Sequence, residues 1–272
     1  MAKYQFGFIG CGNMGGALVR AISSRIPGEE IIIADRLEQN VQTLQTACGV
    51  CAAQTAREIA EDAKYIFLGV KPQGLRELLG ELSPILRKRA DQYTLISMAA
   101  GITLDTLCDM VEIDRVPIIR ILPNTPAAVG KGMTLFCCND YVSPDDADNV
   151  VFALEAAGAV DCLEEHLIDA GCAVSGCGPA FVYLFMEALA DGAVAAGLPR
   201  QKAMMYAAQT VLGASEMLLQ SGKHPGELKD AVCSPGGSTI MGVNALEQGA
   251  FRATVMQAVL AAYEKTRDLG NS

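Results

Sequence analysis

A glycine-rich turn near the start of the chain constrains its fold more than any other feature. The turn follows an apolar run at residues 4–9 and leads into an apolar segment with helical spacing. Gly10, Gly12 and Gly15 form G-x-G-x-x-G between this predicted strand and helix, a pattern typical of dinucleotide binding. The first glycine permits the tight turn, the second admits a pyrophosphate, and the helix N-terminus favours its negative charge. Because an ordinary glycine-rich turn is the alternative, the rest of the chain has to decide between the two.

Strand-like and helix-like segments alternate over roughly the first 160 residues, which indicates a doubly wound, Rossmann-like parallel sheet. The further predicted strands are residues 30–36, 64–70, 93–98 and 116–122. Ligands of such sheets bind at the carboxyl ends of the strands. The loops after the strands should therefore gather on one edge, and they begin at Gly10, Asp35, Val70, Ala99 and Pro123.

Two charged residues after the second predicted strand bear on the choice of nucleotide. Asp35 stands where the dinucleotide fingerprint places the acid that accepts from the ribose 2′-OH, which favours NAD. Arg36 could instead pair with a 2′-phosphate, which favours NADP. A solvated turn between strand and helix is the third interpretation, and the residues alone leave all three open.

The charge balance excludes some classes of partner. Acidic residues outnumber basic residues 31 to 21, for a formal net charge of −10, which argues against nucleic acid or an anionic membrane surface. The first residues show no signal-peptide pattern. The longest uncharged run, residues 170–186, contains glycine and proline and is too short to span a bilayer. We expect a soluble, cytoplasmic protein with no membrane partner.

Cysteine and histidine usage points away from metal chemistry. The ten cysteines are scattered, and without a secretion signal they are expected to be reduced, small apolar residues. Residues 48–51 form a C-x-x-C, but no second pair or nearby histidine completes a zinc set. His166 and His224 are the only histidines, so neither a histidine-rich metal site nor a histidine-centred triad is supported.

The chain changes character near residue 164. Alanine, methionine, leucine and glycine at helical spacing predict helices at residues 181–196, 200–220, 225–232 and 251–267. We therefore expect a dinucleotide-binding domain at residues 1–162 and an all-helical domain at residues 163–272. The mean hydropathy of +0.27 reflects apolar surface, much of it in this last third, that would be costly to expose. We expect a second subunit to cover it.

A second glycine-rich loop lies at residues 233–239. Gly236 and Gly237 precede an apolar segment, and the hydroxyls of Ser238 and Thr239 stand at positions where they could cap a helix. Free N–H groups at such a helix start would hold a carboxylate or a phosphate. An ordinary capped turn is the alternative, and the glycines at residues 176–179 are equally ambiguous. Facing a nucleotide domain, the two loops suggest a substrate pocket.

These motifs together resemble one family, the pyrroline-5-carboxylate reductases, whose members catalyse the last step of proline biosynthesis. The most specific match is residues 224–230 followed by Ser234-Pro235-Gly236-Gly237-Ser238-Thr239-Ile240. Other matching blocks are residues 7–15, 70–73, 99–101, 120–126 and 175–179. The resemblance implies a Rossmann domain, a helical domain that dimerises, an active site completed by both subunits, and larger rings in some members.

The resemblance also implies roles for particular residues. The implied cofactor contacts are Ile9, Gly10, Cys11, Gly12, Asn13, Met14, Arg36, Gly69, Val70, Lys71, Pro72, Ala99, Ala100 and Asn124. The implied substrate contacts are Glu165, Ser234, Gly237, Ser238 and Thr239, with the substrate carboxylate at residues 237–239. Asp35 replaces the small polar residue often found before the phosphate-binding position. NADPH is the expected cofactor, and the use of NADH stays open.

The function that this resemblance implies is hydride transfer from a reduced nicotinamide to C5 of a cyclic imine, which gives L-proline. Little acid–base machinery is needed, since binding and orientation supply most of the acceleration. Thr239 is the predicted catalytic residue, as the hydrogen-bond partner of the ring nitrogen. One alternative is a β-hydroxyacid dehydrogenase, but Lys202, Lys223 and Lys229 do not stand in a helix context like that family's. The other alternative is a non-catalytic, nucleotide-sensing oligomer.

Overall fold

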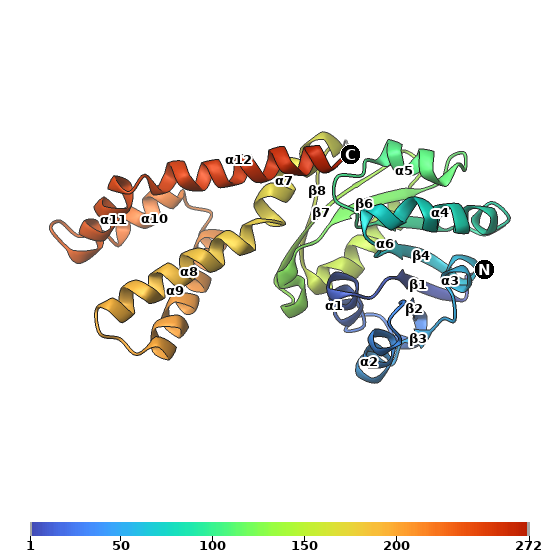
Figure 1. Cartoon of the computed structure of the whole chain (residues 1–272), viewed down its shortest axis with the longest axis horizontal. Helices are drawn as coiled ribbons and strands as arrows, with labels where there is room; N and C mark the ends of the chain where they lie inside the picture. The colour runs from blue at the N-terminus through green and yellow to red at the C-terminus, as the bar shows by residue number, and fades with distance from the viewer. Residues whose placement is uncertain (1, 271–272) are drawn as a thin grey trace. The chain divides into compact units, whose positions relative to one another are not determined.

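The computed structural model describes residues 2–270 and divides the chain into two compact units. The first, which we call the sheet unit, runs to Cys177 and takes in the chain again from Ala262. The second, the helical unit, is Gly178–Ala261. Both units are drawn in Figure 1.

The sheet unit is built on one sheet, with eight strands in the described residues in the order β3-β2-β1-β4-β5-β6-β7-β8. The strands are β1 Tyr4–Ile9, β2 Ile31–Ala34, β3 Cys51–Ala52, β4 Ala63–Leu68, β5 Thr94–Ser97, β6 Ile118–Leu122, β7 Gly132–Cys138 and β8 Gly158–Cys162. The five strands predicted from the sequence are all present. Their sequences are almost continuously apolar because helices cover both faces of the sheet.

Strand direction changes at one end of the sheet, beyond the predicted strands. The strands from β1 to β6 pair in parallel, as expected for repeated strand–helix units. β7, however, runs antiparallel to β6, and β8 is parallel to β7. Only the short 3-10 helix η2 (Thr125–Val129) separates β6 from β7, and a connection this short cannot make a parallel crossover. The five predicted strands are therefore parallel as expected, and the antiparallel pairing begins at β7, a strand that the sequence analysis did not predict.

Seven α-helices and three short 3-10 helices complete the described sheet unit, apart from the end of the last helix of the chain. They are α1 Asn13–Ile22, η1 Gly28–Glu30, α2 Glu38–Cys48, α3 Ala56–Asp62, α4 Pro72–Leu86, α5 Leu104–Val111, η2, α6 Pro144–Leu154, η3 Glu155–Ala157 and α7 Glu165–Ser175.

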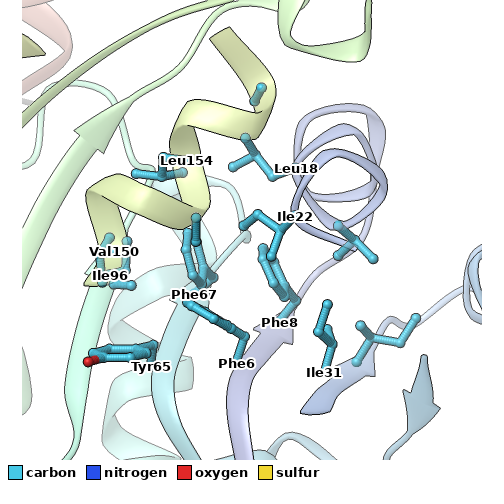
Figure 2. Packing of buried hydrophobic residues seen from close by; sticks show 14 of the residues in the cluster. Phe6, Phe8, Leu18, Ile22, Ile31, Tyr65, Phe67, Ile96, Val150 and Leu154 are labelled. Atoms are coloured by element: carbon cyan, nitrogen blue, oxygen red, sulfur yellow. The ribbon is translucent and has the colours of Figure 1, made fainter. Parts of the chain in front are cut away.

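Two apolar cores, one on each face of the sheet, hold these helices. Figure 2 shows the first core, in which Phe8 and Phe67 stack with ring centroids 4.2 Å apart beneath side chains of α1 and α6. Alternate residues of the same strands reach the second core, where α3, α4, α5 and α7 pack. Burial on both faces leaves the ends of the strands as the place for a ligand.

Helix α7 packs with the sheet, although the sequence assigned it to the helical domain that was expected to begin at residue 163. Ile168 is fully buried in the second core, and a side chain at Gly171 would overlap Leu135 of β7. The compact sheet unit therefore extends to Cys177. The apolar spacing of α7 did not reveal the difference, because a helix that packs on a sheet and one that packs on helices look alike in sequence.

The helical unit contains α8 Gly178–Ala195, α9 Arg200–Ser221, α10 Pro225–Ala231, α11 Ser238–Gln248 and most of α12 Phe251–Gly270. The predicted helices are confirmed, and α8 begins three residues before the expected start. α8 and α9 lie side by side (Figure 1), and their contact buries only Ala190, Ala203 and Ala207. Large apolar side chains instead stay exposed, among them Leu184, Met205, Leu212, Leu219, Met241, Met256 and Leu260.

One helical stretch of the described chain, Glu165–Ala195, is long and apolar enough to cross a membrane by length and composition alone. The expectation that residues 170–186 form too short a run considered only the uncharged residues, whereas this stretch also takes in the rest of α7 and α8. A stretch of this kind is weak support for a membrane span, and α7 packs its buried residues on the sheet.

A buried polar network joins β4 to α6. The Asp146 carboxylate accepts hydrogen bonds from the Tyr65 hydroxyl at 2.8 Å and the Ser143 hydroxyl at 2.7 Å, and pairs with Lys64 Nζ at 2.7 Å. Burial alone raises the pKa of Asp146, but the bonds from Lys64, Ser143 and Tyr65 outweigh it and hold the pKa below its ordinary 3.8. The ionised carboxylate therefore stabilises the fold.

Replacing Asp146 with Asn should lower the free energy of unfolding at pH 7 by about 1–3 kcal/mol, because three polar partners lose their ionised acceptor. The contribution of a lowered carboxyl pKa is present above the ordinary pKa and disappears as pH falls through the lowered one. The gap between wild type and Asp146→Asn should therefore narrow below about pH 4 in urea titrations. Asp148→Asn, an exposed change on the same helix, serves as control. A gap that is constant with pH would contradict the argument.

Candidate active site

The loops at the carboxyl ends of β1, β2, β4, β5 and β6 lie at one edge of the sheet, as the sequence predicted. The strands that carry them are parallel. The loops after β1 and β4 touch directly, since the Gly69 N–H donates to the Ile9 carbonyl at 2.7 Å. The predicted cofactor residues of the sheet unit are thereby collected on this edge.

The glycine-rich turn has the geometry that a dinucleotide requires. Gly10 has φ +96°, a left-handed conformation, and a side chain there would overlap the backbone of Gly69. A side chain at Gly15 would overlap the Gly10 carbonyl, so α1 can approach β1 only without one. Gly12 has open space where its side chain would stand, and it caps α1 with no side-chain partner. The first turn of α1 carries no acidic residue, so its N–H groups are suited to a pyrophosphate.

Asp35 has a role at this turn that the sequence did not reveal. Its Oδ2 accepts from the Cys11 N–H at 2.6 Å, and its Oδ1 accepts from the Leu37 N–H at 2.8 Å. The carboxylate therefore ties the end of β2 to the glycine-rich turn. Each oxygen keeps a lone pair with which it could accept from a ribose hydroxyl. Arg36 beside it is exposed.

The other predicted cofactor residues lie on the loops that follow β4, β5 and β6. Lys71 caps α4 and Pro72 is its first residue, as predicted. Ala99 is buried, and its N–H donates to the Ser97 hydroxyl at 3.3 Å. Asn124 is committed to the fold, because its amide donates to the Ser175 carbonyl at 2.8 Å and accepts from the Met133 N–H at 2.8 Å.

Two buried thiols and one half-buried thiol of the sheet unit are not poised for reaction. Burial raises the pKa of Cys11 and of Cys137 to about 12, and that of Cys172 to about 11. They stay protonated at neutral pH. Of the two histidines, His224 caps α10 by accepting from the Gly226 N–H at 3.1 Å, and His166 lies exposed beside Glu164. Neither of these contacts is a triad contact.

In the helical unit, the predicted substrate residues Ser234, Gly237, Ser238 and Thr239 lie together on the loop that opens α11. Gly236 takes the left-handed conformation at φ +67°, and the Gly237 N–H donates to the Ser234 carbonyl at 3.0 Å. The prediction that these hydroxyls cap the helix was wrong. Gly237 is the N-cap of α11, and it makes no side-chain capping hydrogen bond within the described chain. Ser238 and Thr239 are the first helical residues, and both are exposed. This leaves N–H groups and hydroxyls open to an anionic ligand.

Glu165 begins α7 in the sheet unit, where two donors hold it. Its Oε1 accepts from the Leu104 N–H at 2.6 Å and from Arg120 Nη1 at 3.2 Å. Arg120 also pairs with Asp169 at 2.7 Å and is 1% exposed. Neither Arg120 nor Asp169 was predicted as part of a cluster, although an arginine inside the apolar strand β6 was a visible signal.

Comparison with known proteins identifies two related segments. Residues 165–269 match the family model of pyrroline-5-carboxylate reductase dimerisation. Residues 5–101 match the family model of coenzyme F420-dependent NADP oxidoreductases. The first match covers α7 and the helical unit. The second covers the glycine-rich turn and the loops after β2, β4 and β5.

Similarity to individual proteins extends over the whole chain. The pyrroline-5-carboxylate reductases of Escherichia coli (strain K12) and Arabidopsis thaliana are each 41% identical, covering 98% and 99% of this chain and 99% and 97% of those proteins. The structure of the Coxiella burnetii pyrroline-5-carboxylate reductase matches with TM-score 0.91 and 31% identity, over 99% of this chain and 100% of that one. The Plasmodium falciparum pyrroline carboxylate reductase with NADP bound matches with TM-score 0.88 and 33% identity, over 99% of both chains.

Two alanine substitutions in the glycine-rich turn should have different effects. Gly10→Ala forces a left-handed alanine against the Gly69 backbone, so it should lower the melting temperature and weaken nucleotide binding. Gly12→Ala meets open space, so it should leave the melting temperature unchanged while its methyl group weakens nucleotide binding by about tenfold or more. Calorimetric melting with and without nucleotide, and titration calorimetry, measure both effects. Full nucleotide affinity in Gly12→Ala would contradict the placement of the pyrophosphate.

Proposed function

This chain belongs to the pyrroline-5-carboxylate reductase family and reduces 1-pyrroline-5-carboxylate to L-proline, and we propose how its residues carry out that reaction. The observation that supports the assignment of roles is the pair of helix starts, at α1 and α11, which have neither a side-chain cap nor an acidic first turn. One suits a dinucleotide, and the other suits a small carboxylate. The enzyme is an NADP-dependent oxidoreductase, and both alternatives from the sequence, the hydroxyacid dehydrogenase and the non-catalytic sensor, give way to the reductase.

NADPH fits the edge of the sheet unit. The backbone of residues 10–14 would hold the pyrophosphate, and Arg36 would pair with the 2′-phosphate. The loop at residues 69–72 would form a second contact with the nucleotide, while Ala99 and Ala100 leave room for the flat nicotinamide ring. Asn124, held by its bonds to Ser175 and Met133, would lie nearby. When bound, the reduced nicotinamide supplies the hydride that C5 of the cyclic imine accepts.

The substrate would be held by the loop that opens α11. The N–H groups of Gly237, Ser238 and Thr239 would bind its carboxylate, with the Ser234 hydroxyl alongside. The Thr239 hydroxyl would hydrogen-bond the ring nitrogen, which makes the imine a better hydride acceptor. Glu165 would stand near the substrate as its acidic contact. Orientation by these groups replaces a dedicated acid–base pair.

Thr239→Val should reduce kcat/KM for the imine by about tenfold to a hundredfold, because a hydrogen bond to the reacting nitrogen is lost while the side-chain volume stays. Initial rates of NADPH oxidation by the purified protein measure the change in kcat/KM. Thr254→Val is the matched control, since that exposed hydroxyl bonds to the carbonyl of Ala250, the residue before α12. An unchanged kcat/KM in Thr239→Val would remove the assigned role.

Asp35 should bring the use of NADH closer to that of NADPH, since its fixed carboxylate can accept from a free 2′-OH and repels a 2′-phosphate. Asp35→Asn keeps an acceptor for the Cys11 N–H but removes the charge. The ratio of kcat/KM for NADPH to that for NADH should rise by about tenfold. Arg36→Ala should move the same ratio in the opposite direction. Equal ratios in wild type and Asp35→Asn would show that the carboxylate does not face the ribose.

The chain self-associates through its helical unit, and we propose that it forms a homodimer or a larger ring of dimers. The exposed apolar side chains of α8, α9, α11 and α12 are the surface that a second subunit would cover. We propose that a partner subunit, rather than a membrane, also covers the apolar helix α8, and that the protein works in the cytoplasm. Light scattering in the absence of detergent tests the association of subunits.

A further inference from the structure

The buried guanidinium of Arg120 has no part in the reaction described so far. It projects from β6 with 1% of its side chain exposed, between two carboxylates one helical turn apart on α7, Glu165 and Asp169. Its Nη2 lies 2.7 Å from Asp169, and its Nη1 lies 3.2 Å from Glu165. A charge this deeply buried is rare unless it is paired, and here one cation is shared by two anions.

The hydrogen bonding of Arg120 is incomplete. Its buried Nε has no hydrogen-bond partner among the residues that the structure describes. An unsatisfied buried donor is costly, and one in a native fold calls for a physical reason. The guanidinium therefore keeps the orientation in which its two Nη atoms bond to Glu165 and Asp169, although this leaves Nε without a partner in the described residues.

The position of Glu165 supplies the reason. Besides Arg120, its Oε1 accepts from the Leu104 N–H at 2.6 Å, at the start of α5. Leu104 directly follows the loop that carries Ala99 and Ala100, the residues assigned to the nicotinamide wall. Glu165 is therefore fixed to that wall from one side and to β6 from the other. Its second oxygen has no partner in the described chain, and its side chain is 29% exposed.

We propose that Arg120 is a positioning residue, which holds the Glu165 carboxylate by one oxygen and leaves the other oxygen free for the substrate. This inference rests on the proposed contact between Glu165 and substrate, and it adds a buried residue that acts through Glu165. Arg120 Nη1 binds one oxygen of Glu165, and Asp169 holds the guanidinium through Nη2. The cluster carries one positive and two negative charges, so its net charge is negative.

Steady-state kinetics of the full-length enzyme test the proposal. Arg120→Met frees Glu165, so KM for the imine should rise by about tenfold while KM for NADPH stays within about twofold. Arg120→Lys keeps the positive charge, but a lysine reaches only one carboxylate at a time. Its KM for the imine should therefore lie between the values of the wild type and of Arg120→Met. Asp169→Asn breaks the same buried pair without touching Glu165, so it should lower the melting temperature and change KM for the imine by less than about threefold.

A charge-matched variant separates the effect of the position of Glu165 from the effect of the net charge of the cluster. It also guards against a variant that fails to fold. Arg120→Met with Asp169→Asn keeps the net charge of the cluster at its natural value, so a KM that is still raised is an effect of position. Combining Arg120→Met with Glu165→Gln should be no worse than Glu165→Gln alone, because both act through one carboxylate.

The outcomes assign any failure to a definite claim. An unchanged KM for the imine in both the Arg120→Met enzyme and the charge-matched variant overturns the positioning role while leaving the Glu165 contact intact. Fully additive losses in the double variant with Glu165→Gln also overturn it. An unchanged KM in Glu165→Gln overturns the substrate contact and, with it, the role of Arg120, while the assignments at residues 234–239 stand on their own test.

Discussion

Close backbone contact between two loops is the constraint on which the nucleotide-binding half of this molecule depends. Gly10, Gly15 and Gly69 meet around the Gly10 carbonyl, and none of the three has room for a side chain. The contact lies where β1 has β2 on one side and β4 on the other, which is the point at which the strand order reverses. A crevice opens at such a point, and the start of α1 faces it because nothing holds the helix away. The sheet, both cores and the ligand edge follow from this arrangement.

Much of this fold could be predicted from local pattern. The five strands, the turn at Gly10 and the start of α4 at Pro72 each follow from a few neighbouring residues. The antiparallel β7 and the packing of α7 could not, because strand direction and helix partners depend on segments that are remote in sequence. The prediction of the capping residue of α11 failed for a more local reason. Ser238 and Thr239 are capping residues by type, but the glycine before them takes the cap position.

The candidate site shows the same division. The helix starts at Gly12 and Gly237 were predictable, because glycines before an apolar segment with helical spacing have few explanations. Asp35 was noticed for its possible contact with a ribose, yet its bond to the Cys11 N–H is a tertiary contact that no spacing encodes. Arg120 is the clearest case. A charged residue in the apolar strand β6 signals a partner, but its partners lie on α7, far along the chain.

The helical unit has a consequence for how the molecule folds. Three alanines are all that the contact between α8 and α9 buries fully, while leucines and methionines along the helices remain exposed. A segment with so small an interior cannot offset the entropy of ordering its chain. Its folding and its association are therefore one event. Dilution acts on the fold itself, so the temperature at which this half unfolds should depend on protein concentration, as it does for obligate dimers.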